Sequence, residues 1–182
     1  EAKAAAARGS QPAWAARPLR TRLDAIRRFR EVIVRRTEKL ARTLTDETGK
    51  PITQARNELR GLLPRIDFFL EETPRALRAE CVLADRKAGW QERITWEPLG
   101  LVANISAWNY PYFVSCNVLL PALLTVNAVL YKPSEFASRT GIALVDALHE
   151  SGVPPDIIAA VIGGGEAGAA RLKQEIDGLF FT

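Results

Sequence analysis

Sulfur-containing residues and histidine are scarce in this chain, whose 182 residues include two cysteines, one histidine and no methionine. Two cysteines exclude a disulfide framework, and the His/Cys spacing of a zinc site is absent, so we expect no metal centre. A Ser-His-Asp triad would have to use His149. The low cysteine content favours a reducing compartment, and no secretory signal opens the sequence. We therefore expect a cytoplasmic protein.

The lack of methionine also means that Glu1 is not a natural initiator. At the other end, residues 178–182 form an apolar, aromatic run (Gly-Leu-Phe-Phe-Thr) that is typical of a buried strand. We therefore expect the chain to be a piece of a longer protein. Its composition, 47% hydrophobic and 25% charged, is that of a globular chain.

Charged side chains are missing from residues 98–131, which raises the question of a membrane span. A spanning helix requires about 20 predominantly apolar residues, whereas glycine, asparagine and proline interrupt this stretch. The buried elements of an α/β core explain the same lack of charge, because parallel strands are covered on both faces. We expect no membrane partner.

An amphipathic helix is expected over residues 18–49, because apolar residues recur there at three- and four-residue steps. Thr21-Arg-Leu-Asp24 has the spacing of a capping box, and Gly49-Lys-Pro51 supplies a stop signal. The polar face is basic, but acidic residues are interspersed, so we expect a solvated face with intrahelical ion pairs and no nucleic-acid partner. The arginines of this face are Arg27, Arg28, Arg30, Arg35 and Arg36.

Three further elements are expected before residue 98. A helical pattern runs from residue 59 to 77, and Pro64 should kink or divide it. A shorter helix, holding Trp14, opens at Ser10-Gln-Pro12. Two β-prone runs, residues 81–83 and 93–96, flank a polar connection and predict a hairpin.

After Pro98 the chain alternates between short apolar strands and helical stretches, which indicates βαβ units and a parallel sheet. The fold class is therefore α/β, with an open parallel sheet. The expected strands are residues 101–105, 128–131, 160–162 and 179–181, and the expected helices are residues 113–125, 138–151 and 166–174.

Lys132-Pro-Ser-Glu135 directly follows the predicted strand 128–131. The carboxyl ends of parallel strands are where ligands bind in open α/β sheets. Lys132 could donate hydrogen bonds to the vicinal hydroxyls of a ribose and Glu135 could accept them. A capped turn, in which Pro133 sets φ and Ser134 or Glu135 begins the next helix, explains the same residues equally well.

Two other segments follow predicted strands. Gly163-Gly-Gly165-Glu-Ala-Gly168 satisfies G-x-G-x-x-G, but it follows the third strand instead of the first, so we do not assign it the pyrophosphate of a dinucleotide. In Trp108-Asn-Tyr-Pro111 the Asn109 amide could donate to a developing oxyanion. A buried aromatic turn in which Asn109 caps local backbone groups is the favoured alternative from the residues alone.

Isolated reactive side chains are read as structural. His149 lies in a predicted helix beside Glu150, and we expect it to be solvated. Cys116 has no base near it in sequence and is expected to be a small buried apolar residue instead of a nucleophile.

Three separated segments together resemble the aldehyde dehydrogenase superfamily: Glu97-Pro-Leu-Gly100 leading to Ala107-Trp-Asn-Tyr-Pro111, then Pro121-Ala-Leu with Asn127-Ala-Val-Leu-Tyr-Lys-Pro-Ser-Glu135, then Asp177-Gly-Leu-Phe-Phe-Thr182. Pro12-Ala-Trp14 and Glu47-Thr-Gly-Lys-Pro51 add to the resemblance. Ala107 stands where the family usually has proline, and Val126 stands where a glycine commonly precedes the asparagine, which suggests a divergent member.

The resemblance implies site residues and a cofactor. Asn109 would be the oxyanion-hole side chain, Lys132 and Glu135 the ligands of the adenosine ribose, and Ser106, Ala107 and Trp108 backbone facing the cofactor. Gly165 would lie near the adenine. The cofactor would be NAD, with NADP as the alternative, and the family's nucleophilic cysteine and general-base glutamate would lie beyond Thr182.

The resemblance also implies an activity and a domain plan. The parent protein would oxidise a small-molecule aldehyde to a carboxylic acid; the alternatives are an acylating or acyl-phosphate-reducing relative, or a non-catalytic structural or binding homologue. Residues 1–78 would be helices packing on the cofactor domain, residues 79–97 a hairpin of an oligomerisation element in a homo-oligomer, and residues 98–182 the first part of a dinucleotide-binding domain.

Overall fold

The computed structural model describes residues 1–85, 88–172 and 174–182. A four-stranded parallel sheet, in the order β5-β4-β3-β6, forms its centre. Val102 pairs with Val129 on one side and with Gly178 on the other. The predicted α/β class with a parallel sheet is confirmed. The strands are β3 (Leu101–Ser106), β4 (Ala128–Pro133), β5 (Ile158–Ala160) and β6 (Gly178–Phe181).

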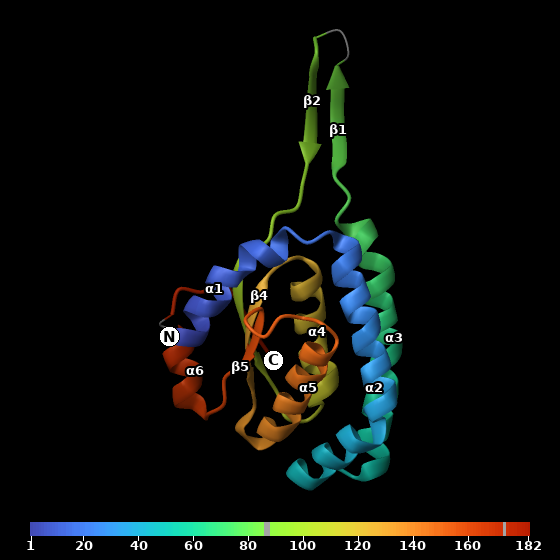
Figure 1. The fold of residues 1–182 in the computed structure, drawn as a ribbon, viewed down its shortest axis with the longest axis vertical. Coiled ribbons are helices and arrows are strands. Elements are labelled where there is room, and N and C mark those ends of the chain that lie inside the picture. The colour runs from blue at the N-terminus through green and yellow to red at the C-terminus, as the bar shows by residue number, and fades with distance from the viewer. Residues whose placement is uncertain (86–87, 173) are drawn as a thin grey trace.

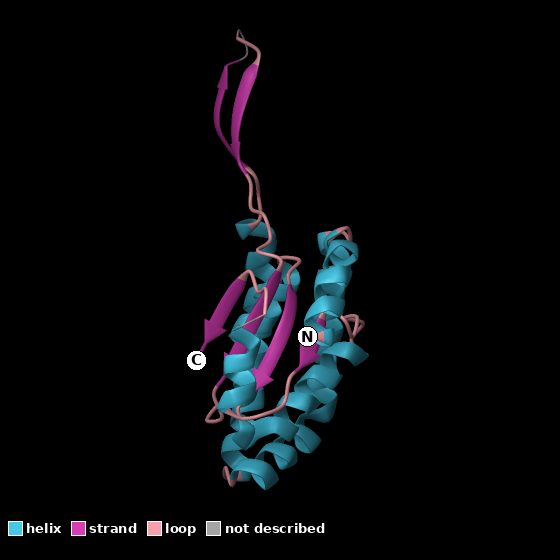
Figure 2. Cartoon of the chain, turned by 90° about the vertical axis from the view of Figure 1, so that its left-hand side faces the viewer, coloured by secondary structure: helices cyan, strands magenta, loops and turns pink. Residues whose placement is uncertain are grey.

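Helices cover both faces of the sheet (Figures 1 and 2). On one face α1 (Ala2–Ala15) packs against β3, β4 and β5, and α6 (Gly165–Leu172) lies beside it. On the other face lie α4 (Pro111–Leu124) and α5 (Ser138–Glu150), which α2 (Leu19–Thr48) and α3 (Ile52–Ala76) cover as an outer layer. The N-terminal helical layer is thus confirmed. The short 3₁₀-helix η1 (Glu135–Ala137) joins β4 to α5.

Both long helices begin immediately after a proline. Pro18 precedes α2 and Pro51 precedes α3, each with φ near −53°, which suits a helix start because the missing N–H is not needed there. The capping box predicted at Thr21 is therefore wrong, since Thr21 lies inside the first turn. The predicted stop is confirmed: Gly49 adopts the left-handed φ of +74° and its N–H donates to the Thr45 carbonyl at 2.9 Å.

Prolines inside the other helices are tolerated. α3 begins at Ile52, earlier than predicted, and Pro64 does not divide it. Pro64 is exposed, so the carbonyl that loses its helical partner can be hydrated. Similarly, α1 begins at Ala2 and holds Pro12 in its interior instead of opening at Ser10.

The basic face of α2 is only partly the solvated face that we expected. Arg27 does pair with Asp24 of the same helix at 2.6 Å. Other arginines bind neighbouring helices instead: Arg30 makes a two-pronged contact with Asp67 of α3, and Arg28 donates to the Ser151 carbonyl at 2.8 Å. Arg35 and Arg36 both bind Glu150 of α5. This face therefore ties α2 to α3 and α5.

The side chains of α1 reach carbonyl groups far along the chain. Lys3 Nζ donates to Ala160 at 2.7 Å, and Trp14 Nε1, which is buried, donates to Leu123 at 2.9 Å. Arg8 donates to the Glu175 carbonyl and binds the Asp177 carboxylate, whose Oδ2 also accepts from the Leu101 N–H at 2.7 Å. α1 thereby holds the segment that leads into β6.

One residue before β4 adopts a conformation that suits glycine. Val126 has a φ of +62°, the only positive φ of a non-glycine residue among those described. For a β-branched side chain this conformation is strained. It occurs at the position where the resemblance led us to expect glycine.

The predicted hairpin is confirmed. β1 (Glu80–Asp85) and β2 (Trp90–Ile94) pair antiparallel and project away from the rest of the chain (Figure 1). The second strand ends at Ile94, two residues earlier than predicted, and residues 86–87 of the predicted connection lie outside the described residues. Exposed apolar side chains gather on the hairpin: Val82, Leu83, Trp90 and Ile94.

The terminal strand forms where expected but is not buried. Within these 182 residues, Phe180 is 41% exposed and Phe181 77% exposed, and β6 pairs with β3 alone among the described strands. The third predicted strand is also displaced: β5 occupies Ile158–Ala160 instead of residues 160–162. The four strands nevertheless follow the predicted order along the chain.

Candidate functional site

The carboxyl ends of β3 and β4 lie side by side, since Ser106 pairs with Pro133 in the parallel register. A cavity of about 540 Å³ opens at this edge, within the range of ligand sites in proteins. Its lining includes six of the seven predicted site residues: Ser106, Ala107, Trp108, Lys132, Glu135 and Gly165. The seventh, Asn109, follows Trp108 on the loop between β3 and α4.

Lys132 and Glu135 face each other at 3.5 Å between Nζ and Oε2. Lys132 belongs to β4, which extends two residues beyond the predicted end, and its side chain is 4% exposed against 49% for Glu135. Nζ also donates to the Pro133 carbonyl at 3.3 Å. A hydrogen bond from its own backbone and the nearby Lys132 charge lower the pKa of Glu135, so its carboxylate is ionised at neutral pH.

The turn interpretation of the same motif also holds. The Ser134 hydroxyl accepts from the Phe136 N–H at 3.3 Å and so caps η1. Capping by Ser134 leaves the Glu135 carboxylate free to face the cavity. The two readings that the sequence left open are therefore compatible.

The glycine run after β5 serves two purposes. Gly163 has a φ of +150°, and a Cβ there would lie 2.6 Å from that of Ala167, so this position requires glycine for the turn into α6. Gly165, the first residue of α6, lines the cavity, and nothing would obstruct a Cβ at that position. Gly165 is thus accessible to a ligand without being sterically required.

The Asn109 side chain is exposed, and its Oδ1 accepts from the Tyr110 N–H at 3.0 Å. The local capping that we favoured from the residues alone is therefore present, but the turn is not buried, since Tyr110 is half exposed. The contact engages the carbonyl oxygen of the amide, which leaves the NH₂ group available as a donor. Beside it, Trp108 is half exposed and its ring meets that of Phe136 edge-on at 6.5 Å.

A neighbouring cavity of about 470 Å³ shares Trp108 and Glu135 with the first and adds Glu47, Thr48 and Phe136. Sequence reasoning did not single out Glu47, although its motif was part of the resemblance. Its carboxylate accepts from the N–H groups of Arg139 and Thr140 and from the Thr140 hydroxyl, each at 2.7 Å. Glu47 therefore fixes the first turn of α5 against the end of α2.

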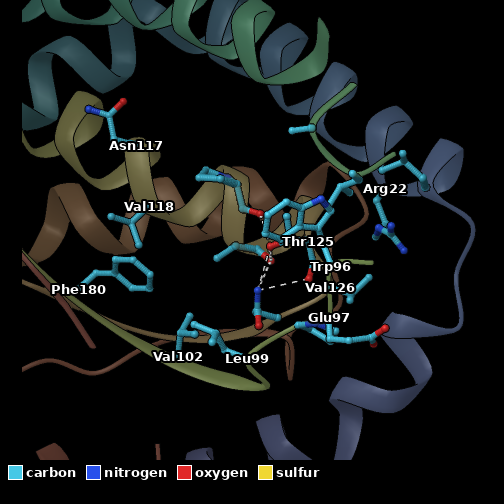
Figure 3. A pocket seen from close by; sticks show the side chains of 17 residues that line it. Arg22, Trp96, Glu97, Leu99, Val102, Asn117, Val118, Thr125, Val126 and Phe180 are labelled. Atoms are coloured by element: carbon cyan, nitrogen blue, oxygen red, sulfur yellow. Dashed lines mark hydrogen bonds between the residues drawn. The ribbon is translucent and has the colours of Figure 1, made fainter. Parts of the chain in front are cut away.

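A larger cavity, of about 770 Å³, lies at the opposite, amino end of the sheet. Figure 3 shows the side chains that line it. Its lining is mainly apolar and includes Trp96, Leu99, Val102, Val118 and Phe180. None of the predicted site residues belongs to it. Size alone therefore does not identify the ligand site, because the predicted Lys132–Glu135 pair lies at the other end.

The lone histidine and Cys116 have structural surroundings. Cys116 is fully buried, as predicted, and burial raises the pKa of its thiol. His149 is not simply solvated: it is partly buried, and its Nε2 lies 2.9 Å from the Ile158 carbonyl. Within residues 1–85, 88–172 and 174–182 no cluster of metal-ligating side chains is found, and no helix has the length and apolarity to cross a membrane.

Comparisons with known proteins relate the chain to one family. Residues 1–182 match the sequence model of the Aldehyde dehydrogenase family. N-succinylglutamate 5-semialdehyde dehydrogenase of Novosphingobium aromaticivorans is 34% identical over 179 residues, which cover 98% of this chain and 38% of the relative. The chain therefore spans little more than a third of that relative's length.

Two solved structures are also similar to nearly the whole of this chain. An NAD-dependent benzaldehyde dehydrogenase from Corynebacterium glutamicum matches with a TM-score of 0.87 at 27% identity, covering 96% of this chain and 39% of that one. An NADP-dependent enzyme from E. coli matches with a TM-score of 0.91 at 26% identity, covering 99% and 37%. Similar structures thus include users of either cofactor.

Proposed function

The chain belongs to the aldehyde dehydrogenase family, and from this premise we propose that the whole protein oxidises an aldehyde to a carboxylic acid with NAD or NADP. Aldehyde and water give the acid; a hydride passes to the cofactor and a proton is released. The observation that carries this proposal is the Lys132–Glu135 pair, which lines one cavity with residues 106–108 at the carboxyl edge of the sheet.

The groups at this cavity fit a dinucleotide. A nearly buried ammonium and a half-exposed carboxylate, 3.5 Å apart, supply a fixed donor and an acceptor for vicinal hydroxyls. Lys132 and Glu135 would hold the adenosine ribose, Ser106, Ala107 and Trp108 would face the cofactor through their backbone, and Gly165 would lie near the adenine. When bound, the cofactor's nicotinamide supplies the hydride acceptor.

Asn109 would stabilise the oxyanion that forms when a thiolate attacks the aldehyde carbon. Its Oδ1 accepts from the Tyr110 N–H, so the NH₂ group is available as the donor that this role requires. The nucleophile itself would come from the part of the protein beyond Thr182. Cys116 does not suit that role, since it is buried and its thiol pKa is raised.

We assign the remaining parts of the chain to subunit contacts and to the cofactor domain. The hairpin at residues 79–97, with its exposed apolar side chains, would pair protomers of a homo-oligomer. Residues 1–78 would form the helical layer of the cofactor domain, and residues 98–182 the first part of that domain. We place the protein in the cytoplasm on the strength of its low cysteine content.

Steady-state assays of the purified full-length protein test the proposal. A panel of aldehydes, including semialdehydes such as those in the relatives' names, is offered with NAD or NADP, and reduced cofactor and acid are measured. We expect equal amounts of the two products, and a raised KM for the cofactor in Lys132→Gln. Formation of a thioester or acyl phosphate would indicate an acylating relative, and no turnover with any aldehyde would contradict the proposal.

A further inference from the structure

A buried ion pair lies behind the loop that carries Asn109. Lys50 follows the end of α2, and Glu58 lies in the second turn of α3; their side chains are 10% and 0% exposed. Lys50 Nζ lies 2.5 Å from Glu58 Oε2. A buried pair of this kind is often no more stabilising than apolar residues of the same volume, so its geometry invites a role besides stability.

Glu58 fixes the start of α4 from another helix. Its Oε1 accepts from the N–H groups of Tyr112 and Phe113, at 2.8 and 3.2 Å. The residue before α4, Tyr110, provides no side-chain cap. The carboxylate therefore satisfies N–H groups that the first turn of a helix leaves unpaired.

Lys50 fixes the loop just before that helix. Its Nζ donates to the Asn109 carbonyl at 2.8 Å and lies 3.8 Å from the centre of the Tyr110 ring. The Asn109 side chain in turn takes its orientation from the Tyr110 N–H. One ammonium thus contacts the carbonyl of the Asn109–Tyr110 peptide, whose N–H orients the Asn109 amide, and the ring of Tyr110.

We propose that Lys50 is a positioning residue that, together with Glu58, aims the Asn109 NH₂ group at the oxyanion. This inference rests on the proposed function, because it assigns Lys50 an effect only through Asn109. A misplacement of about 1 Å can lower a rate 10²-fold. The alternative is that the pair merely joins α2, α3 and α4.

A double-mutant cycle in the full-length enzyme separates these roles. The rate of reduced-cofactor formation in a single turnover is measured for Lys50→Met, Asn109→Ala and the double variant. We expect Lys50→Met to lower the rate about tenfold in the presence of Asn109, less than the 10²- to 10³-fold loss of a whole oxyanion donor. In the Asn109→Ala background it should lower the rate less than about twofold.

Arg30→Met is the matched control, because it breaks another ion pair between α2 and α3, that of Arg30 with Asp67, far from the Asn109 loop. It should change the single-turnover rate less than twofold in either background. Affinity for NAD, measured by fluorescence titration, should be unchanged by Lys50→Met. A raised dissociation constant for NAD would contradict a role through Asn109.

Equal losses from Lys50→Met in both backgrounds, or no loss, would overturn the proposal in favour of a structural pair. If Lys50→Met does not fold, Lys50→Gln, which keeps a donor for one of the two acceptors, replaces it in the cycle under the same criteria. If the proposed function itself were wrong, Asn109→Ala alone would leave the single-turnover rate unchanged, which distinguishes that failure from failure of the Lys50 proposal.

Discussion

The Nζ of Lys132 lies 3.5 Å from Oε2 of Glu135, yet the two side chains are 4% and 49% exposed. The ammonium is fixed among buried residues, whereas the carboxylate extends into the cavity. A ligand at this edge therefore meets a nearly buried cation and a half-exposed anion. We expect this asymmetry to decide which ribose substituents the proposed cofactor site accepts.

We expect the full-length enzyme to prefer NAD over NADP, and Glu135→Gln to improve NADP use relative to NAD. The lowered pKa of Glu135 keeps the carboxylate charged, and bringing a 2′-phosphate beside it is unfavourable. The expected gain in the ratio of kcat/KM values is about tenfold, or ~1.4 kcal/mol. Asp156→Asn, which removes an exposed charge elsewhere, should leave that ratio unchanged. A wild-type enzyme that favours NADP would refute the role of Glu135 in choosing the cofactor.

Asn109→Ala should lower kcat of the full-length enzyme by about 10²- to 10³-fold, the usual effect of losing one oxyanion donor. Cofactor affinity should stay nearly constant, because Asn109 does not line the cavity that holds Lys132 and Glu135. Stopped-flow and titration measurements give the two quantities. Asn57→Ala, on an exposed position of α3, is the control. If Asn109→Ala kept turnover within a few-fold of wild type, local capping would be the only role of Asn109.

The 182 residues by themselves should not oxidise aldehydes. The two thiols they contain are unsuited: Cys116 is buried with a raised pKa, and Cys81 lies on the projecting hairpin. The assay is reduced-cofactor formation by the purified 182-residue chain. Measurable turnover would mean that one of these cysteines acts as a nucleophile.

Asp177→Asn should destabilise the protein at neutral pH and much less in acid. The Leu101 N–H, and then Arg8, lower the pKa of Asp177 in the folded state. Its stabilising effect is therefore complete above the unfolded pKa of about 3.9 and is lost as the pH falls through the folded value. We expect Tm to fall by about 2–4 °C at pH 7, as ~1 kcal/mol would produce. Wild type and variant should converge as the pH falls below the lowered folded pKa, and a pH-independent difference would rule out this linkage.

Val126→Gly should be neutral or stabilising. The left-handed φ of +62° is unfavourable by about 1–2 kcal/mol for a residue with a Cβ, which outweighs the 0.5–1 kcal/mol or so of extra chain entropy that glycine loses on folding. Urea unfolding should show a gain of up to about 1 kcal/mol. Val129→Gly in the buried strand β4 is the contrast and should be strongly destabilising; a comparable loss in both variants would argue against strain.

Local patterns predicted the helices and strands well where one face is buried. The apolar periodicity of residues 18–49 and the stop at Gly49 correspond to α2. The mainly apolar strands β3 and β4 are buried. Strands β3 and β4, which follow one another in the chain, pair in parallel as expected. This pairing places residues 106–108 and Lys132 at one edge of the sheet. These features depend on contacts that are close in sequence or dictated by parallel topology.

Contacts between distant segments could not be read from the chain. Nothing near Arg35 or Arg36 indicates Glu150 as their partner, and nothing near Asn109 indicates Lys50. The capping box at Thr21 failed because Pro18 already ends the preceding turn and begins the helix.

The hydrogen bonds of α1 have a consequence for the order of folding during synthesis. Lys3 and its acceptor at Ala160 are 157 positions apart, so a ribosome adding about 5–20 residues per second takes about 8–30 s to make the second partner after the first. Until then α1 lacks β5 and this acceptor. Among the described elements, α1 is thus made well before the last of the strands that it covers, so its complete docking follows the synthesis of those strands instead of preceding it.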